Sequence, residues 1–125
     1  MRIFVDTSVL FSAIFSPNGH ARDLLNLAVD NILTLVISQD VLDETERNLQ
    51  KKAPGKVLLF TTLITLLEPE IVQNLTVEEV AVAAVYTARK DAPIVAAAIK
   101  AGVDYLVTYD HKDLLDPSEV AANSV

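Results

Sequence analysis

The sequence predicts an α/β protein in which a central parallel sheet lies between two layers of helices. Short apolar or β-branched runs at residues 2–5, 33–37 and 104–108 alternate with longer segments of helical periodicity. This alternation favours parallel strands with helices on both faces of the sheet. Hydrophobic residues make up 51% of the 125 residues and charged residues 22%, a globular composition. We therefore expect one domain over residues 1–125, built on a single core.

The first half of the chain alternates strongly between strand and helix signals. Within the helix expected at 20–29, the large apolar side chains predict an inward face made of Leu24, Leu25, Leu27 and Val29. The elements expected here are a strand at 2–5, a buried helix at 9–15, a helix at 20–29, a strand at 33–37 and a helix that Ser38 caps and that runs to about Leu49.

The second half continues the same alternation. Pro69 lacks a backbone donor, so the strand around it is expected at an edge of the sheet. The expected elements are a helix at 56–67, an edge strand at 68–72, a helix that starts at Thr76, a helix from near Asp91 to Ala101 and Gly102, and a last strand at 104–108.

The composition also excludes several classes of protein. No apolar run approaches the roughly 20 residues that a membrane-spanning helix needs, and Asp6 interrupts what would be a signal peptide. Without cysteine there is neither a disulfide framework nor a thiolate metal site, and we expect a cytoplasmic protein without membrane partners. The net charge of −7 argues against a broad basic surface for nucleic acid, unless several acids share a metal ion.

Three aspartates follow strands or begin a helix in a way that suggests a common site. Asp6 follows the strand at 2–5, Asp110 follows the strand at 104–108, and Asp91 opens a predicted helix. Ligands of open parallel sheets bind beyond the carboxyl ends of the strands. Taken singly, each aspartate is more commonly a helix cap or turn residue. Together they would repel one another unless a cation is shared.

A glutamate on the helix at 39–49 is a further candidate. Val41, Thr45 and Leu49 lie on one face of the helical wheel, together with Leu42. Glu44 and Glu46 flank this apolar face on opposite sides, whereas Asp43 points away from it. Periodicity therefore leaves two candidates, and for each of them a solvated position is an equally good explanation.

Three segments together resemble the PIN-domain nucleases, specifically the toxin components of prokaryotic toxin–antitoxin systems, the VapC-like ribonucleases. These segments are VDTSVL at 5–10, ISQDVLDETERNL at 37–49 and KDAPIVAAAIKAGVDYLVTYDHKDL at 90–114. Each motif is short, but their order and spacing are specific, and the resemblance extends from Met1 to about Leu115.

The resemblance implies a divalent-metal-dependent endoribonuclease that hydrolyses RNA phosphodiester bonds. Its acidic quartet falls on Asp6, Glu44, Asp91 and Asp110, which selects Glu44 over Glu46. The first, third and fourth of these acids are expected to ligate the metal, and Glu44 to ligate it or orient water. The supporting residues expected from the resemblance are Thr7, Ser8, Thr108 and Asp113.

The chemistry of these side chains indicates which ion and which partners to expect. Carboxylate oxygens, in a chain without Cys and with only two His residues, suit Mg²⁺ or Mn²⁺ rather than zinc. The resemblance further implies an RNA substrate, a small antitoxin protein and a homodimer. Family members usually continue past the final acid into another short strand, so this strand can be absent from a chain that ends at Val125.

Two other interpretations remain open at this point. The same fold could act as a catalytically silent binding module, although all four matched positions carry acids. A phosphoryl-transfer domain also places an Asp after its first strand, but it needs a paired acid two residues later, where this chain has Ser8.

Other polar residues carry weaker signals. His20 and His111 are expected to be exposed turn residues. Lys51, Lys52 and Lys56 form a basic cluster with Arg47; it could follow an RNA backbone, but a solvated helix end is its commoner meaning.

Overall fold

The computed structural model describes residues 1–73, 75–85, 87 and 92–109. Its strands are β1 (Arg2–Val5), β2 (Thr34–Ser38), β3 (Glu70–Val72) and β4 (Tyr105–Val107). They form a parallel sheet in the order β3-β2-β1-β4. In this sheet Arg2 pairs with Thr34, Ile37 with Ile71 and Phe4 with Leu106. The predicted parallel α/β fold is confirmed, with β3 at an edge.

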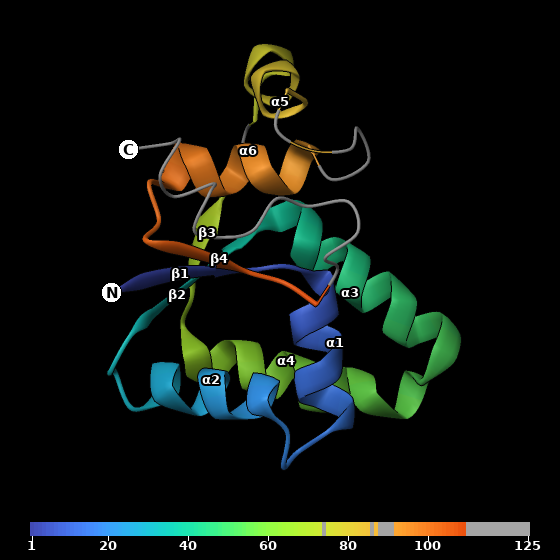
Figure 1. Cartoon of the computed structure of the whole chain (residues 1–125). Coiled ribbons are helices and arrows are strands. Elements are labelled where there is room, and N and C mark those ends of the chain that lie inside the picture. The colour runs from blue at the N-terminus through green and yellow to red at the C-terminus, as the bar shows by residue number, and fades with distance from the viewer. Residues whose placement is uncertain (74, 86, 88–91, 110–125) are drawn as a thin grey trace.

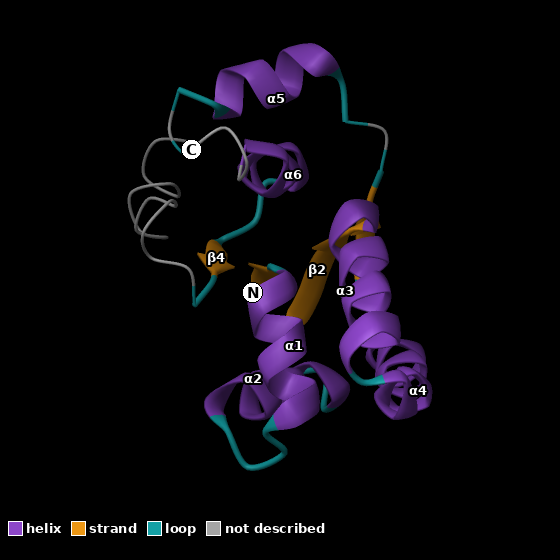
Figure 2. Cartoon of the chain, turned by 90° about the vertical axis from the view of Figure 1, so that its right-hand side faces the viewer, coloured by secondary structure: helices purple, strands orange, loops and turns teal. Residues whose placement is uncertain are grey.

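Helices cover both faces of this sheet, as Figures 1 and 2 show. On one face lie α1 (Thr7–Phe15), α2 (His20–Val29) and α4 (Val57–Leu67), and α3 (Gln39–Lys52) packs beside α1. On the other face α6 (Ala92–Ala101) lies against the sheet, and α5 (Val77–Ala83) packs on α6. The short helical turn η1 (Pro54–Lys56) joins α3 to α4. The expected three layers are therefore present.

The core consists of aliphatic side chains from the strands and from the helices on both faces. β1 and β2 are buried on both sides, and accordingly their sequences IFV and LVI are continuous apolar runs. α6 contributes mainly alanine, with Ala92, Ala96, Ala97 and Ala98 all buried. Small side chains let this helix lie close to the sheet. None of the helices in the described ranges is long and apolar enough to cross a membrane.

Helix start signals predicted the local structure well. The Asp6 side chain accepts a hydrogen bond from the Val9 backbone at the start of α1, and the Ser38 side chain accepts one from Val41 at the start of α3. Thr76 and Glu79 form a reciprocal capping box at the start of α5. These caps place the ends of β1 and β2 directly beside the first turns of α1 and α3.

The predicted inward face of α2 is wrong in part. Leu25 is buried, but Leu27 and Val29 are both 39% exposed. The helix packs instead through Ala21, Leu25 and Ala28, which are spaced four and three residues apart. Counting only large apolar residues overlooked two alanines, and these small residues allow α2 to approach α1 closely.

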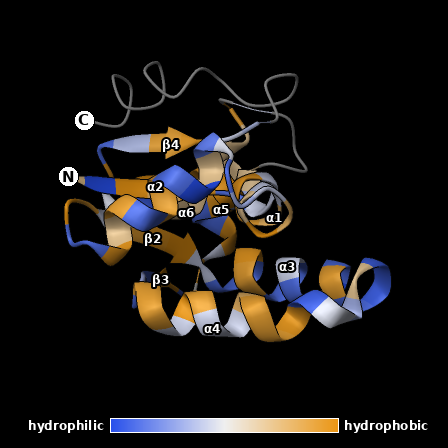
Figure 3. Cartoon of the chain, turned by 90° about the horizontal axis from the view of Figure 1, so that it is seen from below, coloured by the Kyte–Doolittle hydropathy of each residue, from blue (hydrophilic) through white to orange (hydrophobic). Residues whose placement is uncertain are grey.

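α4 is the most apolar surface helix among the described elements, and Figure 3 shows it mainly in the hydrophobic colour. Only Phe60 and Leu67 are buried, whereas Leu58 and Leu66 are 77% and 60% exposed. Its three threonines donate their hydroxyl hydrogens to carbonyls one turn earlier in the helix. The helix therefore presents little polar surface and no charge.

Candidate functional site

Polar side chains gather at the carboxyl edge of the sheet. Asp6 follows β1, Ser38 ends β2 and Thr108 follows β4. These residues are 3%, 2% and 6% exposed, and they are three of the four buried polar residues in the described ranges. Because the strands are parallel, these three residues lie at one edge, where open α/β sheets bind their ligands.

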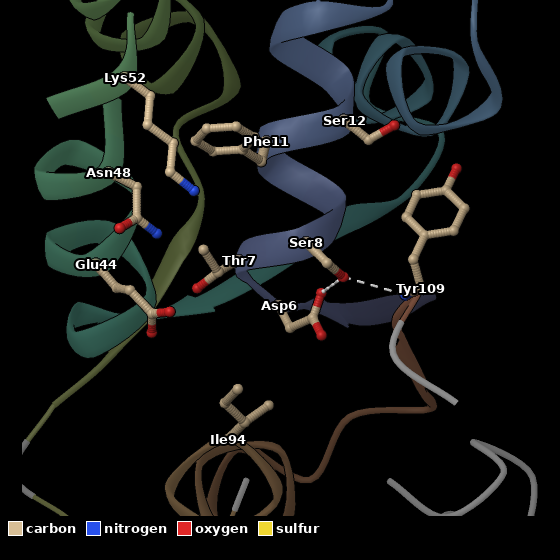
Figure 4. A pocket seen from close by; sticks show the side chains of 10 residues that line it. All are labelled: Asp6, Thr7, Ser8, Phe11, Ser12, Glu44, Asn48, Lys52, Ile94 and Tyr109. Atoms are coloured by element: carbon tan, nitrogen blue, oxygen red, sulfur yellow. Dashed lines mark hydrogen bonds between the residues drawn. The ribbon is translucent and has the colours of Figure 1, made fainter. Parts of the chain in front are cut away.

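The Asp6 carboxylate is held by three hydrogen-bond donors. Ser8 Oγ donates to Oδ1 at 2.6 Å, the Val9 backbone N–H donates to the same oxygen at 3.2 Å, and the Thr108 hydroxyl donates to Oδ2. Ser8 Oγ also accepts a hydrogen bond from the Tyr109 backbone at 3.1 Å, as Figure 4 shows. This network fixes the carboxylate and connects the end of β4 to the first turn of α1.

A pocket of about 590 Å³ opens beside Asp6, between α1 and α3. Such a volume lies within the range of roughly 300–1,000 Å³ that is usual for ligand sites. Glu44 reaches the pocket from α3 and faces the side of Asp6 and Thr7 in Figure 4. The residues that line the pocket are Asp6, Thr7, Ser8, Phe11, Ser12, Glu44, Asn48, Lys52, Ile94 and Tyr109.

The structure brings together four of the residues that the sequence singled out for the site. Asp6, Thr7, Ser8 and Glu44 all line the pocket, whereas Glu46 does not. Thr108 lies behind Asp6 and contacts its carboxylate instead of lining the pocket. Periodicity alone left Glu44 and Glu46 open, and the packing of α3 turns Glu44 toward Asp6.

The other predicted acids, Asp91, Asp110 and Asp113, lie outside the described residues. Two described residues near them in the sequence line the pocket. Ile94 is in the first turn of α6, and Tyr109 directly precedes Asp110 in the chain. The described pocket therefore contributes two of the four acids in the predicted quartet.

The donor chemistry of the described pocket fits a hard divalent cation. Asp6 and Glu44 offer carboxylate oxygens, the ligands that Mg²⁺ and Mn²⁺ favour. A carboxylate has about four acceptor positions, and Asp6 uses three of them for the hydrogen bonds above. Thr7 Oγ1 is buried and has no hydrogen-bond partner among the described residues. Buried polar atoms normally have partners, so this hydroxyl can serve a bound ion, its water or a phosphate.

The described acids alone do not complete a metal site. Within the described ranges no three residues among His, Cys, Asp and Glu converge closely enough to hold an ion. No lysine or arginine in that part of the chain forms an ion pair with Asp6 or Glu44. Two acids without a cationic partner thus face the same pocket, and a cation would relieve their repulsion.

Sequence reasoning missed five residues that line the pocket, namely Phe11, Ser12, Asn48, Ile94 and Tyr109. A signal for three of them was present in the helical spacing. Phe11 and Ser12 follow Thr7 and Ser8 by four residues on α1, and Asn48 follows Glu44 by four residues on α3. Extending each helix face by one turn would have placed these three beside the acids.

Comparisons with known proteins identify the family. The chain is similar to a crystal structure of PAE2754 from Pyrobaculum aerophilum, with a TM-score of 0.61 and 20% sequence identity, over 99% of this chain and 98% of that one. This likeness shows the fold. A search of curated proteins finds no significant match. Among protein-family models, the PIN domain matches residues 2–112. With most of its length covered by this match, the chain belongs to the PIN domain family.

Proposed function

We propose that this PIN-domain protein is a Mg²⁺- or Mn²⁺-dependent endoribonuclease that acts as the toxin of a toxin–antitoxin pair. PIN domains are commonly nucleases, and the described pocket contains two of the four acids that the resemblance assigns to such an activity. The observation that supports the proposal most directly is the Asp6 carboxylate, which is buried, held by three donors and not paired with a lysine or arginine among the described residues.

Each predicted site residue that the structure describes has a role in this proposal. Asp6 is a metal ligand whose position the hydroxyls of Ser8 and Thr108 fix. Glu44, on the opposite wall of the pocket, ligates the ion or orients the attacking water. The free hydroxyl of Thr7 binds a phosphate oxygen or a water of the ion. Asp91 and Asp110 complete the proposed ligand set.

A divalent ion at this site would bind the scissile phosphate and lower the pKa of a bound water. The remaining task of the protein side chains is to hold the ion and the substrate in a fixed position. An aspartate fixed by hydroxyls and a backbone amide keeps its geometry when the substrate arrives, so little reorganisation is required. In the proposed reaction the water oxygen bonds to phosphorus and one P–O ester bond breaks, which leaves a phosphate monoester on one fragment and a free hydroxyl on the other, without a covalent enzyme intermediate.

The first test replaces Asp6 with Asn, which keeps the size and the helix-capping ability of the side chain. Replacing a residue that surrounds a metal ligand usually lowers activity about 10- to 100-fold. Because Asp6 is itself a proposed ligand, we expect Mn²⁺-dependent cleavage of single-stranded RNA to fall by more than this. Asp43→Asn is the matched control, because Asp43 is exposed and does not line the pocket. Unchanged cleavage by the Asp6 variant would refute the assignment.

A second pair of variants tests the choice between the two glutamates. Glu44→Gln should reduce turnover and Glu46→Gln should not, because only Glu44 lines the pocket with Asp6. Calorimetric titration with Mn²⁺ addresses the silent-module alternative. A binding module without catalysis would show no specific binding of the ion and no loss of binding in the Asp6→Asn variant.

The toxin role and its partners rest on the sequence resemblance. If the proposal is correct, induced expression of the wild-type protein in bacterial cells inhibits growth, and expression of the Asp6→Asn variant does not. An antitoxin would restore growth and co-purify with the protein. A homodimer is part of the same proposal, and light scattering of the purified protein would detect it.

A further inference from the structure

The pocket extends beyond its acids along the facing sides of two helices. On α3, Glu44, Asn48 and Lys52 line it at intervals of four residues, and on α1, Thr7 and Phe11 do so at the same interval. Eight residues of helix rise by about 12 Å. Figure 4 shows the acids toward one end of this pocket and Lys52 with Phe11 toward the other.

The end far from the acids combines a cation with an aromatic ring. Lys52 Nζ lies 5.8 Å from the centre of the Phe11 ring. Among the described residues, Lys52 is the only basic side chain that lines the pocket. The nearby Lys51 and Lys56 do not line it. The Phe11 ring also contacts the ring of Phe15, with the ring centres 4.8 Å apart and the planes tilted by 36°. Phe11 is therefore supported from one turn further along α1.

Asn48 lies between the acidic and the basic parts of the pocket. It is half-buried, and its side-chain amide has no hydrogen bond to the described residues. An amide offers both a donor and an acceptor, which matches the edges of nucleic acid bases and the 2′-hydroxyl of ribose. Its position one helical turn from Glu44 would let it contact the nucleotide next to a phosphate bound at the acids.

We propose that Phe11, Asn48 and Lys52 form a subsite for one unpaired nucleotide adjacent to the cleaved bond. Lys52, which lies over the Phe11 ring without substrate, turns to the neighbouring phosphate, and the ring then stacks on the base. Asn48 hydrogen-bonds to the base edge or the ribose. Proteins that bind single-stranded nucleic acids combine basic side chains, which follow the backbone, with aromatic rings on which the bases stack. The inference rests on the proposed nuclease function, and it assigns the residues that hold the nucleotide next to the cleaved bond.

A charge argument favours this interpretation over a purely structural role of Lys52. The chain carries a net charge of −7, and the described acids of the pocket repel phosphate until a metal ion is bound. A cation at the opposite end of the pocket gives the substrate a second point of attraction. It also orients the strand, because the two ends of the pocket then differ in charge.

The test measures nucleotide binding separately from cleavage. Fluorescence anisotropy of a labelled single-stranded RNA, recorded in EDTA and again in Ca²⁺, gives the Kd for the wild type and for Phe11→Leu, Phe11→Tyr and Lys52→Met. We expect Phe11→Leu to weaken binding roughly 5- to 100-fold, the range for loss of one stacked base. Phe11→Tyr, which keeps an aromatic face, should bind within about twofold of the wild type if stacking is the cause.

Lys52→Met provides a second measurement in case Phe11→Leu disturbs the fold. Lys52 is exposed, so its replacement leaves the core intact. It should lower the slope of log Kd against log salt concentration by about 0.7, the contribution of one phosphate contact to a single strand. Lys51→Met is the matched control, since Lys51 is the adjacent basic residue and does not line the pocket. We expect it to leave the Kd within about twofold.

The outcomes separate the subsite from the nuclease function. In cleavage assays the variants should raise KM and leave kcat nearly unchanged. If the wild type cleaves RNA and neither Phe11→Leu nor Lys52→Met changes Kd or KM, the subsite is refuted and the nuclease function stands. If the wild type binds RNA through these residues but does not cleave it, the nuclease proposal fails and the subsite stands. Equal affinity for duplex RNA would refute the requirement for an unpaired base.

Discussion

The charged side chains at the two edges of the sheet differ in whether they are paired with each other. At the amino edge, the Arg2 guanidinium donates hydrogen bonds to the Glu70 carboxylate and to the carbonyls of Ala101 and Gly102. The Asp104 carboxylate accepts a hydrogen bond from the Arg2 backbone at 2.8 Å. At the carboxyl edge, Asp6 and Glu44 face a pocket without an ion pair among the described residues. One edge is internally neutralised, and the other is open.

This contrast indicates what each edge contributes to the protein. Arg2 ties the start of β1 to the end of α6 and, across β2, to β3, so its contacts stabilise the fold and leave little for a ligand. The hydroxyls around Asp6 fix its geometry but supply no compensating charge. Charges that are arranged precisely and left uncompensated are the usual sign of a binding site. Changes at one edge should therefore affect stability, and changes at the other should affect metal binding and catalysis.

The largest expected effect is on the stabilisation of the folded protein by Mn²⁺, which should differ between variants at the two edges. At an Mn²⁺ concentration of 100 times its Kd, binding to the folded state alone stabilises a protein by about 2.7 kcal/mol. We expect this increment in the wild type and in Arg2→Met, and we expect Asp6→Asn to lose it. Thermal unfolding with and without Mn²⁺ measures all three. If Arg2→Met loses the increment as well, the two edges are not independent.

Thr108 offers a subtler change at the carboxyl edge. Thr108→Val keeps the shape of the side chain and removes the hydroxyl that donates to Asp6 Oδ2. Loss of such a partner usually reduces metal affinity or activity about 10- to 100-fold, which corresponds to about 1.4–2.7 kcal/mol. We expect this loss in the Mn²⁺ dependence of RNA cleavage. Thr45→Val is the control, because the hydroxyl of this buried threonine bonds only to its own helix, at Val41 O. A loss of equal size in the control would mean that the effect is not specific to Asp6.

Sequence reasoning located the strand-end residues but not the shape of the pocket. Asp6 could be placed at this edge from the strand that precedes it, because parallel strands end at one edge, whereas Thr108 was expected only from the resemblance. Glu44 could not be separated from Glu46 by periodicity, since the helical wheel does not show how α3 lies relative to α1. In the structure, Thr45 and its apolar neighbours bury one face of α3 against the fold, and this turns Glu44 toward α1.

The same limitation explains what was missed. Phe11 and Asn48 carry no charge that would single them out. Their spacing of four residues from Thr7 and Glu44 places them on the same helix faces, but only the packing of α1 against α3 makes those faces line one pocket. The exposed positions of Leu27 and Val29 were also not predictable from their hydrophobicity, because two alanines determine how α2 packs. Local signals, such as the caps at Ser38 and Thr76, were reliable because they depend on a few neighbouring atoms.

At the amino edge, Arg2→Met should destabilise the fold by about 2 kcal/mol. The variant leaves the end of α6 without its donor and Glu70 without its partner, and hydrogen bonds to charged groups contribute about 1.5–3 kcal/mol. The pair is partly exposed, with side chains that are 33% and 48% accessible, so the ion pair itself adds little. Urea unfolding measures the change. Arg47→Met, at an exposed position of α3, should stay within about 0.5 kcal/mol of the wild type. If the two variants are equally stable, Arg2 does not hold the amino edge together.

The smallest expected effect lies at neither edge, in the capping box of α5, and it sets the scale for a purely local contact. Thr76→Ala should cost about 1 kcal/mol, the usual loss for a threonine cap.

The Thr76 backbone N–H, which donates to the Glu79 carboxylate, lowers the pKa of Glu79 below its usual value, and the Thr76 hydroxyl and Lys100 act in the same direction. A lowered pKa in the folded state stabilises the fold at pH values above 4.5 and loses this contribution as the pH falls through the lowered value. Unfolding measured from neutral pH to below this range should therefore show a weaker acid dependence in Glu79→Gln than in the wild type. Thr62→Ala on α4, which removes a hydroxyl bonded only within its helix, should leave that acid dependence unchanged. Neither Thr76→Ala nor Glu79→Gln should alter the stabilisation by Mn²⁺, because the capping box contacts neither Asp6 nor Glu44. An altered stabilisation would show that α5 is coupled to the carboxyl edge.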